Sequence, residues 1–374
     1  MPRVPGIARA RICHTKVADD DFTEDVATIR RQRGTKELPY NHLIPMAILV
    51  NAEGPLLEQI HDATYDTWHE GLSRHAYGRF YAAQVATVWG QRGLHRLALV
   101  EGNELLASAK VYAFNAVLDG RDARVIGLGA VFTQPAHRGR GAARDLIERI
   151  LAPPSAEGVE LALLFSEIGP DYYARLGFDA IATTDRQLRV TESTRYGAPA
   201  TMVRSGDDRD LADIVSMGRA RVTASGGIAP YRFHLSRDRD LVHFAIARKR
   251  LLAGLGPSGA RAVHFFIAEE GASAAAYVVI SVQGNVWTLE EAGDRDPSGA
   301  RVGAILQVLI ARDPAEKRPS IKAWLPDGFL PPQVTVVGEK PSGEVMMVRA
   351  LTERARGLAP LAAADVFYWR GDAF

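Results

Sequence analysis

The sequence has very little cysteine and no long hydrophobic run. Cys13 is the one cysteine among 374 residues, and a single thiol forms neither an internal disulfide nor a cysteine metal cluster, which favours a reducing, cytoplasmic environment. No apolar stretch approaches the roughly 18 residues of a membrane-spanning helix, and the basic first residues lack the apolar core of a secretory signal. We therefore expect a cytoplasmic protein without a membrane partner.

Excess charge of one sign is also missing. The 45 Lys and Arg residues face 44 Asp and Glu residues, which gives a net charge of +1. A near-neutral chain has no global attraction to nucleic acid, and its arginines are not interleaved with the aromatic residues that nucleic-acid binders use. His61, His69 and His75 lack the spacing of a zinc motif. We expect neither a nucleic-acid partner nor a metal site.

What the sequence does contain is typical of an ordinary globular protein. Apolar residues make up 47% and charged residues 24%, values that exclude collagen-like and wholly disordered chains. At about 150 residues per domain, the length predicts about two domains. Residues 1–45 are polar with runs of charge and predict a loosely attached N-terminal extension.

Residues 46–197 predict one α/β unit. Two helices are expected at 55–68 and 73–89, followed by three strands joined by short turns at 95–102, 104–114 and 123–133. The period then changes, and predicts a helix at 141–151, a strand at 159–166, a short helix at 170–176 and a strand from residue 178. An antiparallel half followed by a βαβα half predicts a mixed, mainly antiparallel sheet.

Residues 198–374 repeat this order in weaker form. A helix is expected at 207–220, strands at 262–270, 274–282 and 285–292, a loop and helix within 293–314, and later strands at 320–326 and 343–350. The sequence therefore predicts an internal duplication. The aromatic segment 364–374 predicts a C-terminus that docks against a surface, because free termini are normally polar.

One segment predicts an anion-binding loop. A strand runs into Pro135, and the sequence Arg-Gly-Arg-Gly-Ala-Ala at 138–143 then opens a helix. Free N–H groups at a helix start, together with the helix dipole, bind phosphate, and Arg138 and Arg140 add positive charge. The alternative is a solvated, arginine-rich turn before an ordinary helix. The segment is neither a Walker loop nor a dinucleotide fingerprint.

A second segment, read together with this loop, indicates a family. The strand at 161–166 is followed by Tyr-Tyr-Ala-Arg-Leu-Gly-Phe at 172–178. With both segments in this order behind a meander of strands, the chain resembles the GNAT superfamily of acyl-CoA-dependent N-acetyltransferases. The resemblance implies two GNAT-like units with mixed sheets, splayed at the acyl-CoA site, of which the second is degenerate.

Two groups within the superfamily are similar in part. Segments 68–72, 131–133, 137–141 and 165–173 resemble the fungal lysine N6-acetyltransferase family. The tandem layout is similar to the Eis-like aminoglycoside and lysine acetyltransferases. Because the acceptor does not follow from the fold, these resemblances leave several amines open.

The resemblance implies roles for particular residues. Acetyl-CoA would be the cosubstrate, with no metal, and its pantetheine arm would face the backbone of Val131, Phe132 and Thr133. The backbone of Gly139, Arg140, Gly141, Ala142 and Ala143, with the Arg138 side chain, would hold the pyrophosphate. Tyr173 would protonate the departing thiolate, with Tyr172 as the second candidate. The alternative for each tyrosine is core packing.

The proton acceptor and the amine pocket have several candidates. Glu167, at the end of a strand, is either the base or a structural acceptor for backbone N–H groups. In Eis-like enzymes the terminal carboxylate reaches the site, which makes Phe374 a second candidate. Tyr65, Trp68 and Tyr81 would line the amine pocket, although helical aromatic residues more often belong to the core.

The second half departs from the pattern where a pyrophosphate loop would lie. Asp294, Asp296 and a proline occupy this stretch, and carboxylates repel a pyrophosphate. We therefore predict no second acetyl-CoA site. Glu290 and Glu291 are candidate partners for an acceptor ammonium group, and the alternative is that both are solvated residues at a strand end.

These observations predict direct transfer of an acetyl group from acetyl-CoA to the primary amine of a small molecule, without an acyl-enzyme. A lysine-like amino acid is the favoured acceptor, and an aminoglycoside or polyamine is the alternative within the class. A regulatory protein that binds acyl-CoA without turnover, and a partner-binding protein that has lost the cofactor, are the alternatives outside it. A homo-oligomer is left open.

Overall fold

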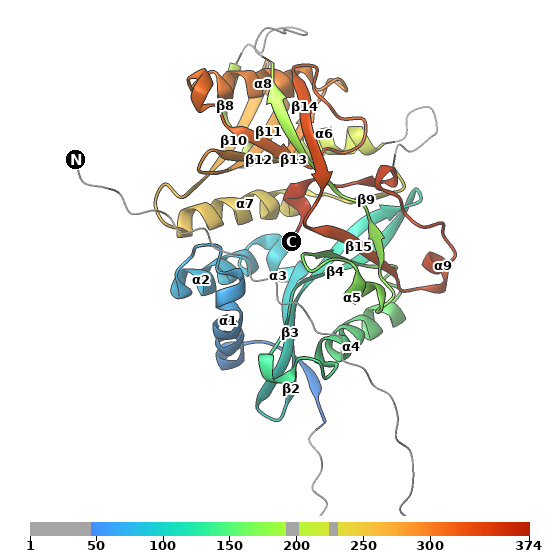
Figure 1. Ribbon diagram of the computed structural model, residues 1–374. Helices are drawn as coiled ribbons and strands as arrows, with labels where there is room; N and C mark the ends of the chain where they lie inside the picture. Colours follow the sequence, from blue (N-terminus) through green and yellow to red (C-terminus); the bar gives the residue numbers. More distant parts are fainter. Residues whose placement is uncertain (1–45, 192–201, 224–230) are drawn as a thin grey trace, which may run out of the picture. The chain divides into compact units, whose positions relative to one another are not determined.

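Two mixed β-sheets form the framework of the computed structural model, which describes residues 46–191, 202–223 and 231–374 (Figure 1). The expected extension at 1–45 and the expected boundary at 197/198 lie outside these residues. The first sheet follows the order β1 (Ile48–Asn51), β2 (Leu94–Glu101), β3 (Glu104–Leu118), β4 (Arg121–Thr133), β5 (Leu161–Ser166), β15 (Val345–Ala350) and β6 (Asp179–Ile181). Two short strands, β9 (Phe233–Leu235) and β16 (Val366–Phe367), extend it beside β3.

The second sheet is formed mainly by the second half of the chain. Its order is β14 (Val334–Pro341), β7 (Thr184–Val190), β13 (Ser320–Ala323), β12 (Val286–Asp294), β11 (Ser273–Gln283), β10 (Arg261–Glu270) and β8 (Met202–Ser205). The prediction of an α/β fold with mixed, mainly antiparallel sheets is confirmed.

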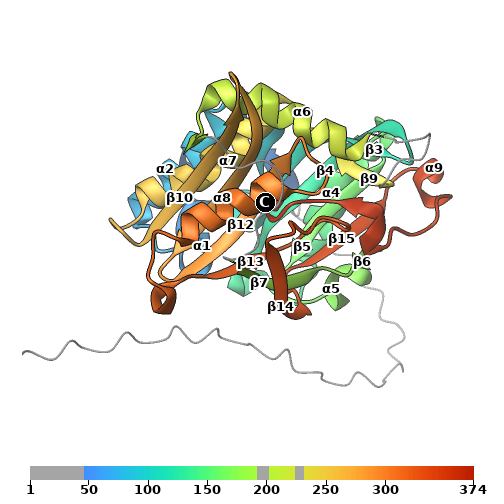
Figure 2. The same cartoon turned by 90° about the horizontal axis from the view of Figure 1, so that it is seen from above.

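Helices cover both sheets. They are α1 (Gly54–Trp68), α2 (Arg74–Val85), α3 (Val88–Gly93), α4 (Ala142–Ala156), α5 (Asp171–Ala174), α6 (Leu211–Val222), α7 (Arg239–Leu255), α8 (Ala300–Ile310) and α9 (Glu353–Arg356). Figure 1 shows α7 between the two sheets, and Figure 2 shows α8 lying across the strands of the second sheet. No helix of the described ranges is long and apolar enough to cross a bilayer.

The early helices begin where their capping residues predict. Ser73 accepts a hydrogen bond from the Ala76 N–H at 3.2 Å and starts α2, as its N-cap character predicts. The single helix expected at 73–89 is wrong, however, because Thr87 caps a new helix by accepting from the Gly90 N–H at 3.0 Å. A local side-chain cap thus divides the expected helix in two.

The duplication has a structural counterpart. Along the chain, the first half has the order β2, β3, β4, α4 and β5, and the second half has the order β10, β11, β12, α8 and β13. In both cases three antiparallel strands are followed by a helix and by a strand that pairs in parallel with the third. The two halves therefore share one local topology.

The two sheets exchange strands. Strand β7 lies next to β13 and β14 of the second sheet, whereas β15 lies between β5 and β6 of the first. The sequence analysis expected a strand in both stretches but assigned neither to the other half. It also did not predict α7, although Asp238 caps this helix and Leu241 and Ala245 recur at helical spacing on its buried side.

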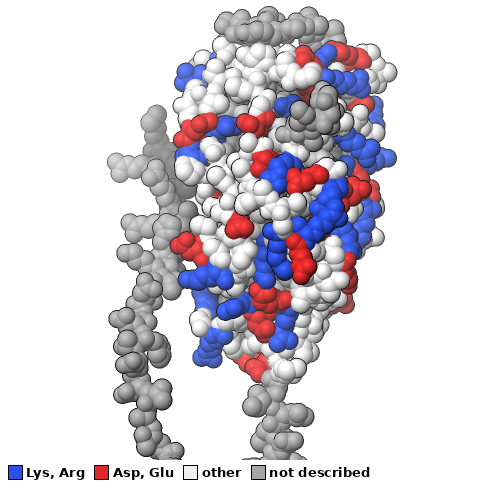
Figure 3. All heavy atoms as spheres, turned by 90° about the vertical axis from the view of Figure 1, so that its right-hand side faces the viewer, with Lys and Arg blue, Asp and Glu red and all other residues white. Residues whose placement is uncertain are grey.

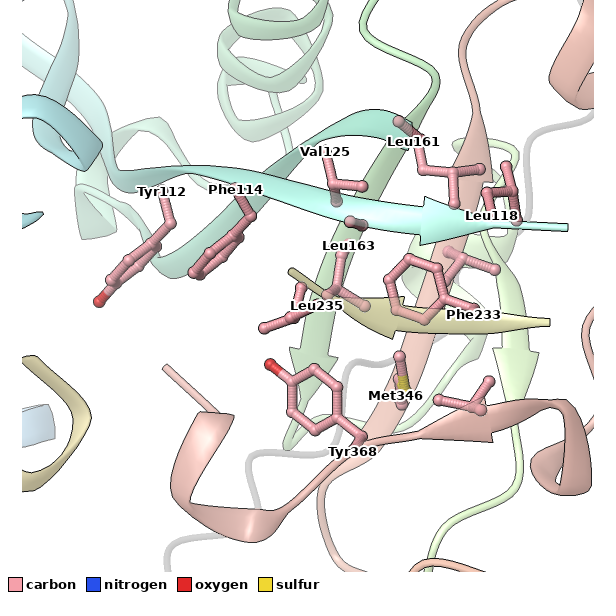
Figure 4. Close-up of a cluster of buried hydrophobic side chains, with 14 of the residues drawn as sticks. Tyr112, Phe114, Leu118, Val125, Leu161, Leu163, Phe233, Leu235, Met346 and Tyr368 are labelled. Carbon is pink, nitrogen blue, oxygen red and sulfur yellow. The ribbon is translucent and has the colours of Figure 1, made fainter. Parts of the chain in front are cut away.

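An aromatic and aliphatic core joins the tail to the first sheet. Figure 4 shows Tyr112 and Phe114 of β3 in one cluster with Met346 of β15 and Tyr368 of the tail. Trp369 is 1% exposed, so the prediction that segment 364–374 docks is confirmed. On the outer face shown in Figure 3, basic and acidic side chains lie side by side, as the near-neutral net charge leads one to expect.

We predict that the fragment 46–197 does not fold alone. It lacks β15, so β5 and β6 lose their shared neighbour, and the fully buried Met347 is missing from the core. Far-UV circular dichroism and urea unfolding test this, with the chain 46–374 as the control that keeps both sheets. A cooperative unfolding transition of the fragment would contradict the prediction.

Candidate active site

Strands β4 and β5 separate part of the way along their length. They pair in parallel from Val125 and Leu161 to Leu128 and Leu164 and no further. Beyond this point β4 stays paired with β3, and β5 stays paired with β15. The backbone of Gly129–Thr133 and of residues 165–166 therefore borders an opening, here called the fork, at which backbone groups are left without a strand partner.

A β-bulge lies on the β4 side of the fork. Gly129 is opposite Lys110 and Phe132 is opposite Ser108, so β4 has one residue more than β3 over this interval. Ala130 has a φ of +45°, which an alanine rarely adopts. A bulge redirects backbone groups. Of the three residues predicted to face the pantetheine arm, Val131 lies within the bulge, and Phe132 and Thr133 directly follow it.

The predicted anion-binding loop follows β4. Gly139 and Gly141 have φ angles of +74° and +83°, which favour glycine, and Gly141 precedes the first residue of α4. No side chain caps this helix, so its first N–H groups are available to a ligand. Arg138 and Arg140 are exposed beside them, and the Arg138 Nε donates to the Thr133 carbonyl at 3.3 Å, which links the loop to the fork.

The two tyrosines of α5 differ in burial. Tyr173 is 9% exposed and lies in one core cluster with α4, its ring 6.0 Å from that of Phe178, whereas Tyr172 is half-buried. Among the described residues, the Tyr173 hydroxyl has no hydrogen-bond partner. Burial, reinforced by Tyr172 and Glu167, raises the pKa of Tyr173 to about 12. Its phenol therefore keeps its proton at neutral pH.

Glu167 comes directly after β5 at the open end of the fork. Its side chain is exposed, yet partial burial of the carboxyl and the nearby carboxylates of Glu344 and Glu70 raise its pKa, against an opposing effect of Arg370. No backbone N–H of the described residues donates to its carboxylate.

The C-terminus also reaches the fork. The Phe374 ring lies 4.5 Å from that of Tyr112 and 5.6 Å from that of Phe165, on β3 and β5. A Cβ atom at Gly127 would lie 2.5 Å from this ring, and one at Gly129 would lie 3.5 Å from the Phe374 backbone oxygen. The two glycines of β4 therefore admit the last residue of the chain to the fork.

A cavity of about 450 Å³, here called the charged cavity, adjoins the fork on this face of the first sheet. Lys110 and Tyr112 of β3, Phe374, α7 and the strands β10 to β13 line it. Lys110 lies opposite Gly129, at the bulge of β4. A molecule in the charged cavity is therefore next to the point at which β4 and β5 separate.

The predicted amine-pocket residues have mixed outcomes. Trp68 meets Phe132 of the fork, with ring centroids 6.2 Å apart, but the Tyr65 hydroxyl donates to the Leu72 carbonyl at 2.8 Å and Tyr81 belongs to the core. Glu290 lines the charged cavity. None of the three aromatic residues does.

The two glutamates are already paired with cations of the same chain. Glu290 lies 3.0 Å from Lys249, and Glu291 lies 2.6 Å from Arg237. They are 5% and 1% exposed, so the alternative that they are solvated strand-end residues is wrong. Both lie within β12 and not at its end, and Lys249 of α7 and Gly371 of the tail lie against Glu290. The local sequence does not reveal this cover.

The sequence analysis missed the cations of the charged cavity. Lys110 lies in the middle of a mainly apolar strand, which is an unusual position for a lysine and was the available signal. Arg248 and Lys322 come from α7 and β13 and give no local signal, because only the packing of the two halves brings them to the same cavity.

In the second half, two parallel strands also separate, but a carboxylate of the chain occupies the start of the following helix. Strands β12 and β13 pair only as far as Leu289 and Ala323. The Asp294 carboxylate accepts hydrogen bonds from the N–H groups of Arg301 and Val302 at 2.8 and 3.3 Å, at the start of α8. A carboxylate of the chain thus occupies the donors that a phosphate would need, which is a physical reason for the predicted absence of a second acetyl-CoA site.

Comparison with known proteins agrees with this geometry. Residues 60–181 match the family described as an acetyltransferase (GNAT) domain. A search of curated proteins gave no match. Among the described residues, no group of histidine, cysteine and acidic side chains is arranged to hold a metal ion.

Solved structures share the fold over most of the chain. A GCN5-related N-acetyltransferase from Kribbella flavida is 17% identical, with a TM-score of 0.57 over 83% of this chain and 72% of that one. A second from Anabaena variabilis is 10% identical, with a TM-score of 0.59 over 82% and 73%. A probable N-acyltransferase from Enterococcus faecalis is 12% identical, with a TM-score of 0.58 over 82% and 72%. Residues 60–181 therefore form a GNAT-type acetyltransferase domain, and the chain shares the fold of these solved structures.

Proposed function

We propose that the protein transfers an acetyl group from acetyl-CoA to the primary amine of a small molecule, with a lysine-like amino acid as the favoured acceptor. The observation that carries the proposal is the fork with its bulge, followed within ten residues by an uncapped helix start that two exposed arginines precede. This arrangement offers one site for a thioester and one for a pyrophosphate.

The donor would be held mainly by backbone groups. The N–H groups that begin α4, which no side chain caps, and the guanidinium of Arg138 would bind the pyrophosphate. The bulged backbone at Val131 and Phe132 would donate to the pantetheine arm and to the thioester oxygen. Fixed backbone donors stabilise the negative charge that develops on this oxygen in the transition state.

The reaction would proceed by direct attack. The neutral amine nitrogen forms a bond to the thioester carbonyl carbon, the carbon–sulfur bond breaks, and Tyr173 gives its proton to the departing thiolate. The ammonium proton of the intermediate passes to Glu167, to the terminal carboxylate of Phe374 or to water. Glu167 and Phe374 both border the fork, and Cys13, in segment 1–45, lies outside the described residues.

An assay of thiol release from acetyl-CoA tests this function. Lysine, other amino acids, polyamines and aminoglycosides serve as acceptors, and calorimetry measures CoA binding in parallel. Turnover with an amine supports the proposal. Tight CoA binding without turnover of any amine would favour a regulatory protein, and the absence of CoA binding would remove the basis of the proposal.

We predict that Gly141→Glu abolishes CoA binding. The substitution places a carboxylate at the start of α4 and a side chain where φ is +83°. Gly120→Glu is the matched control, because Gly120 has a φ of +77° and equally open surroundings but lies in the β3–β4 turn at the other end of these strands. Calorimetric binding that survives in Gly141→Glu would show that the loop does not hold the pyrophosphate.

We predict that Tyr173→Phe lowers kcat by about 10²-fold or more, because the variant keeps the ring in the core but removes the proton donor. CoA affinity should change little. Tyr172→Phe is the matched control on the same helix. An unchanged kcat in Tyr173→Phe would transfer the role to Tyr172 or to water.

The proton acceptor can be assigned by moving one carboxylate at a time. Adding one glycine after Phe374 displaces the terminal carboxylate but keeps the ring, and Glu167→Gln removes the other carboxylate. We expect one of the two changes to lower kcat by about 10²-fold. Phe374→Leu, which keeps a terminal carboxylate, controls for lost packing. Full activity in both variants would assign the step to water.

A further inference from the structure

The charged cavity contains more basic than acidic groups. Six basic and three acidic side chains line it. Three ion pairs lie among them, Lys249–Glu290 at 3.0 Å, Arg261–Glu70 at 2.7 Å and Arg370–Glu344 at 2.6 Å. With the terminal carboxylate of Phe374 included, the lining keeps a surplus of two positive charges when every group is ionised.

Three of the six cations have no carboxylate partner among the described residues. Lys322 of β13 has an exposed side chain in the cavity wall. Arg248 of α7 donates to the Ala373 carbonyl. Lys110 of β3 lies over the ring of Tyr81, 5.7 Å from its centroid. The other three cations are each neutralised by a glutamate. Lys322, Arg248 and Lys110 are not, so their charges can attract an anion into the cavity.

A second buried cation increases the positive potential at Lys110. Arg96 of β2 is directly opposite Lys110 and 5% exposed, and its guanidinium donates to the Ser108 hydroxyl at 3.1 Å. Burial, together with Arg96 and Arg248, lowers the pKa of Lys110 to about 7. Like charges directly opposite on neighbouring strands are destabilising, and a bound anion would offset this repulsion.

We infer that the acceptor of the proposed reaction is an amine that also carries an anionic group, a carboxylate or a phosphate, and that the charged cavity binds this group through Lys322, Lys110 and Arg248. The inference rests on the proposed function, because it assigns the substrate class of the same site. It places the amine end at the fork, beside Gly129 of β4, and the anionic end within the charged cavity that Lys322, Lys110 and Arg248 line.

The same charges disfavour acceptors that carry only positive charge. A polyamine or an aminoglycoside would enter a cavity in which each carboxylate side chain already has a cation of the chain within 3.0 Å. Uncompensated cations in a partly enclosed site repel such a ligand. An amine with an anionic group instead supplies the missing partner, and hydrogen bonds between charged groups are stronger than neutral ones.

Matched amines test the substrate class with the unaltered protein. Lysine and 1,5-diaminopentane differ by the carboxylate, and lysinamide keeps the shape of lysine without this charge. Phosphoethanolamine and ethanolamine form the corresponding pair for a phosphate. We expect kcat/KM for the anionic member of one pair to exceed that of its neutral or cationic counterpart by about tenfold or more, and the pair that shows the effect identifies the anion.

Variants test the residues. Lys322→Glu should lower kcat/KM for the preferred anionic amine by about tenfold or more and raise it for the cationic counterpart. Lys322→Arg should retain the preference, and Lys110→Met should weaken it. Lys340→Met, an exposed lysine of β14 outside the cavity, is the matched control and should change nothing. Calorimetry with the amine and CoA gives a readout separate from turnover.

The outcomes separate this inference from the proposed function. Failure to bind CoA or to turn over any amine would overturn the proposed function itself. Turnover with 1,5-diaminopentane and ethanolamine equal to or above that with lysine and phosphoethanolamine would overturn the inference alone. A weaker CoA affinity in Lys322→Glu, with an unchanged amine preference, would overturn it as well, because the cations would then serve the donor.

Discussion

The buried guanidinium of Arg237 holds the C-terminal tail, and the site depends on this contact. It lies 2.6 Å from Glu291 of β12 and 3.4 Å from Asp372 of the tail, and all three side chains are almost fully buried. A buried charge that loses its partner costs about 3–5 kcal/mol, so the three groups hold one another. Two residues beyond Asp372, the chain ends at the fork, with Phe374 against Gly127 and Gly129.

The tail also explains how two similar halves come to differ. Both have a parting of parallel strands, an extra residue in the third strand and a glycine before the following helix. In the second half, Gly371 lies against the Glu290 backbone at the bulge, and Asp294 takes the N–H groups of α8. In the first half, the corresponding backbone groups are left for a ligand. The same local topology thus supports the tail in the second half and leaves backbone groups available to a ligand in the first half.

What the sequence predicts well is local. The loop at 138–143 and the segment at 172–178 are each one unbroken stretch of sequence, so their glycines, helix start and aromatic residues can be read along the chain. The structure has a helix after the loop and a separating pair of strands where these segments predict them. The position of β15 between β5 and β6, and the meeting of Lys110, Arg248 and Lys322 in one cavity, depend on residues more than 70 positions apart. Local hydrophobic periodicity carries no information about contacts between distant residues. The residues on the acceptor side of the site could therefore be identified only from the folded structure.

The exchange of β7 and β15 bears on how the protein is made. During synthesis, β5 and β6 emerge long before residues 345–350, and their facing edges stay without this partner until β15 has been produced. Non-local strand pairing of this kind is slow, and exposed strand edges favour aggregation. The first sheet is therefore completed only once residues 345–350 have been synthesised, and until then the nascent chain exposes two unpaired strand edges.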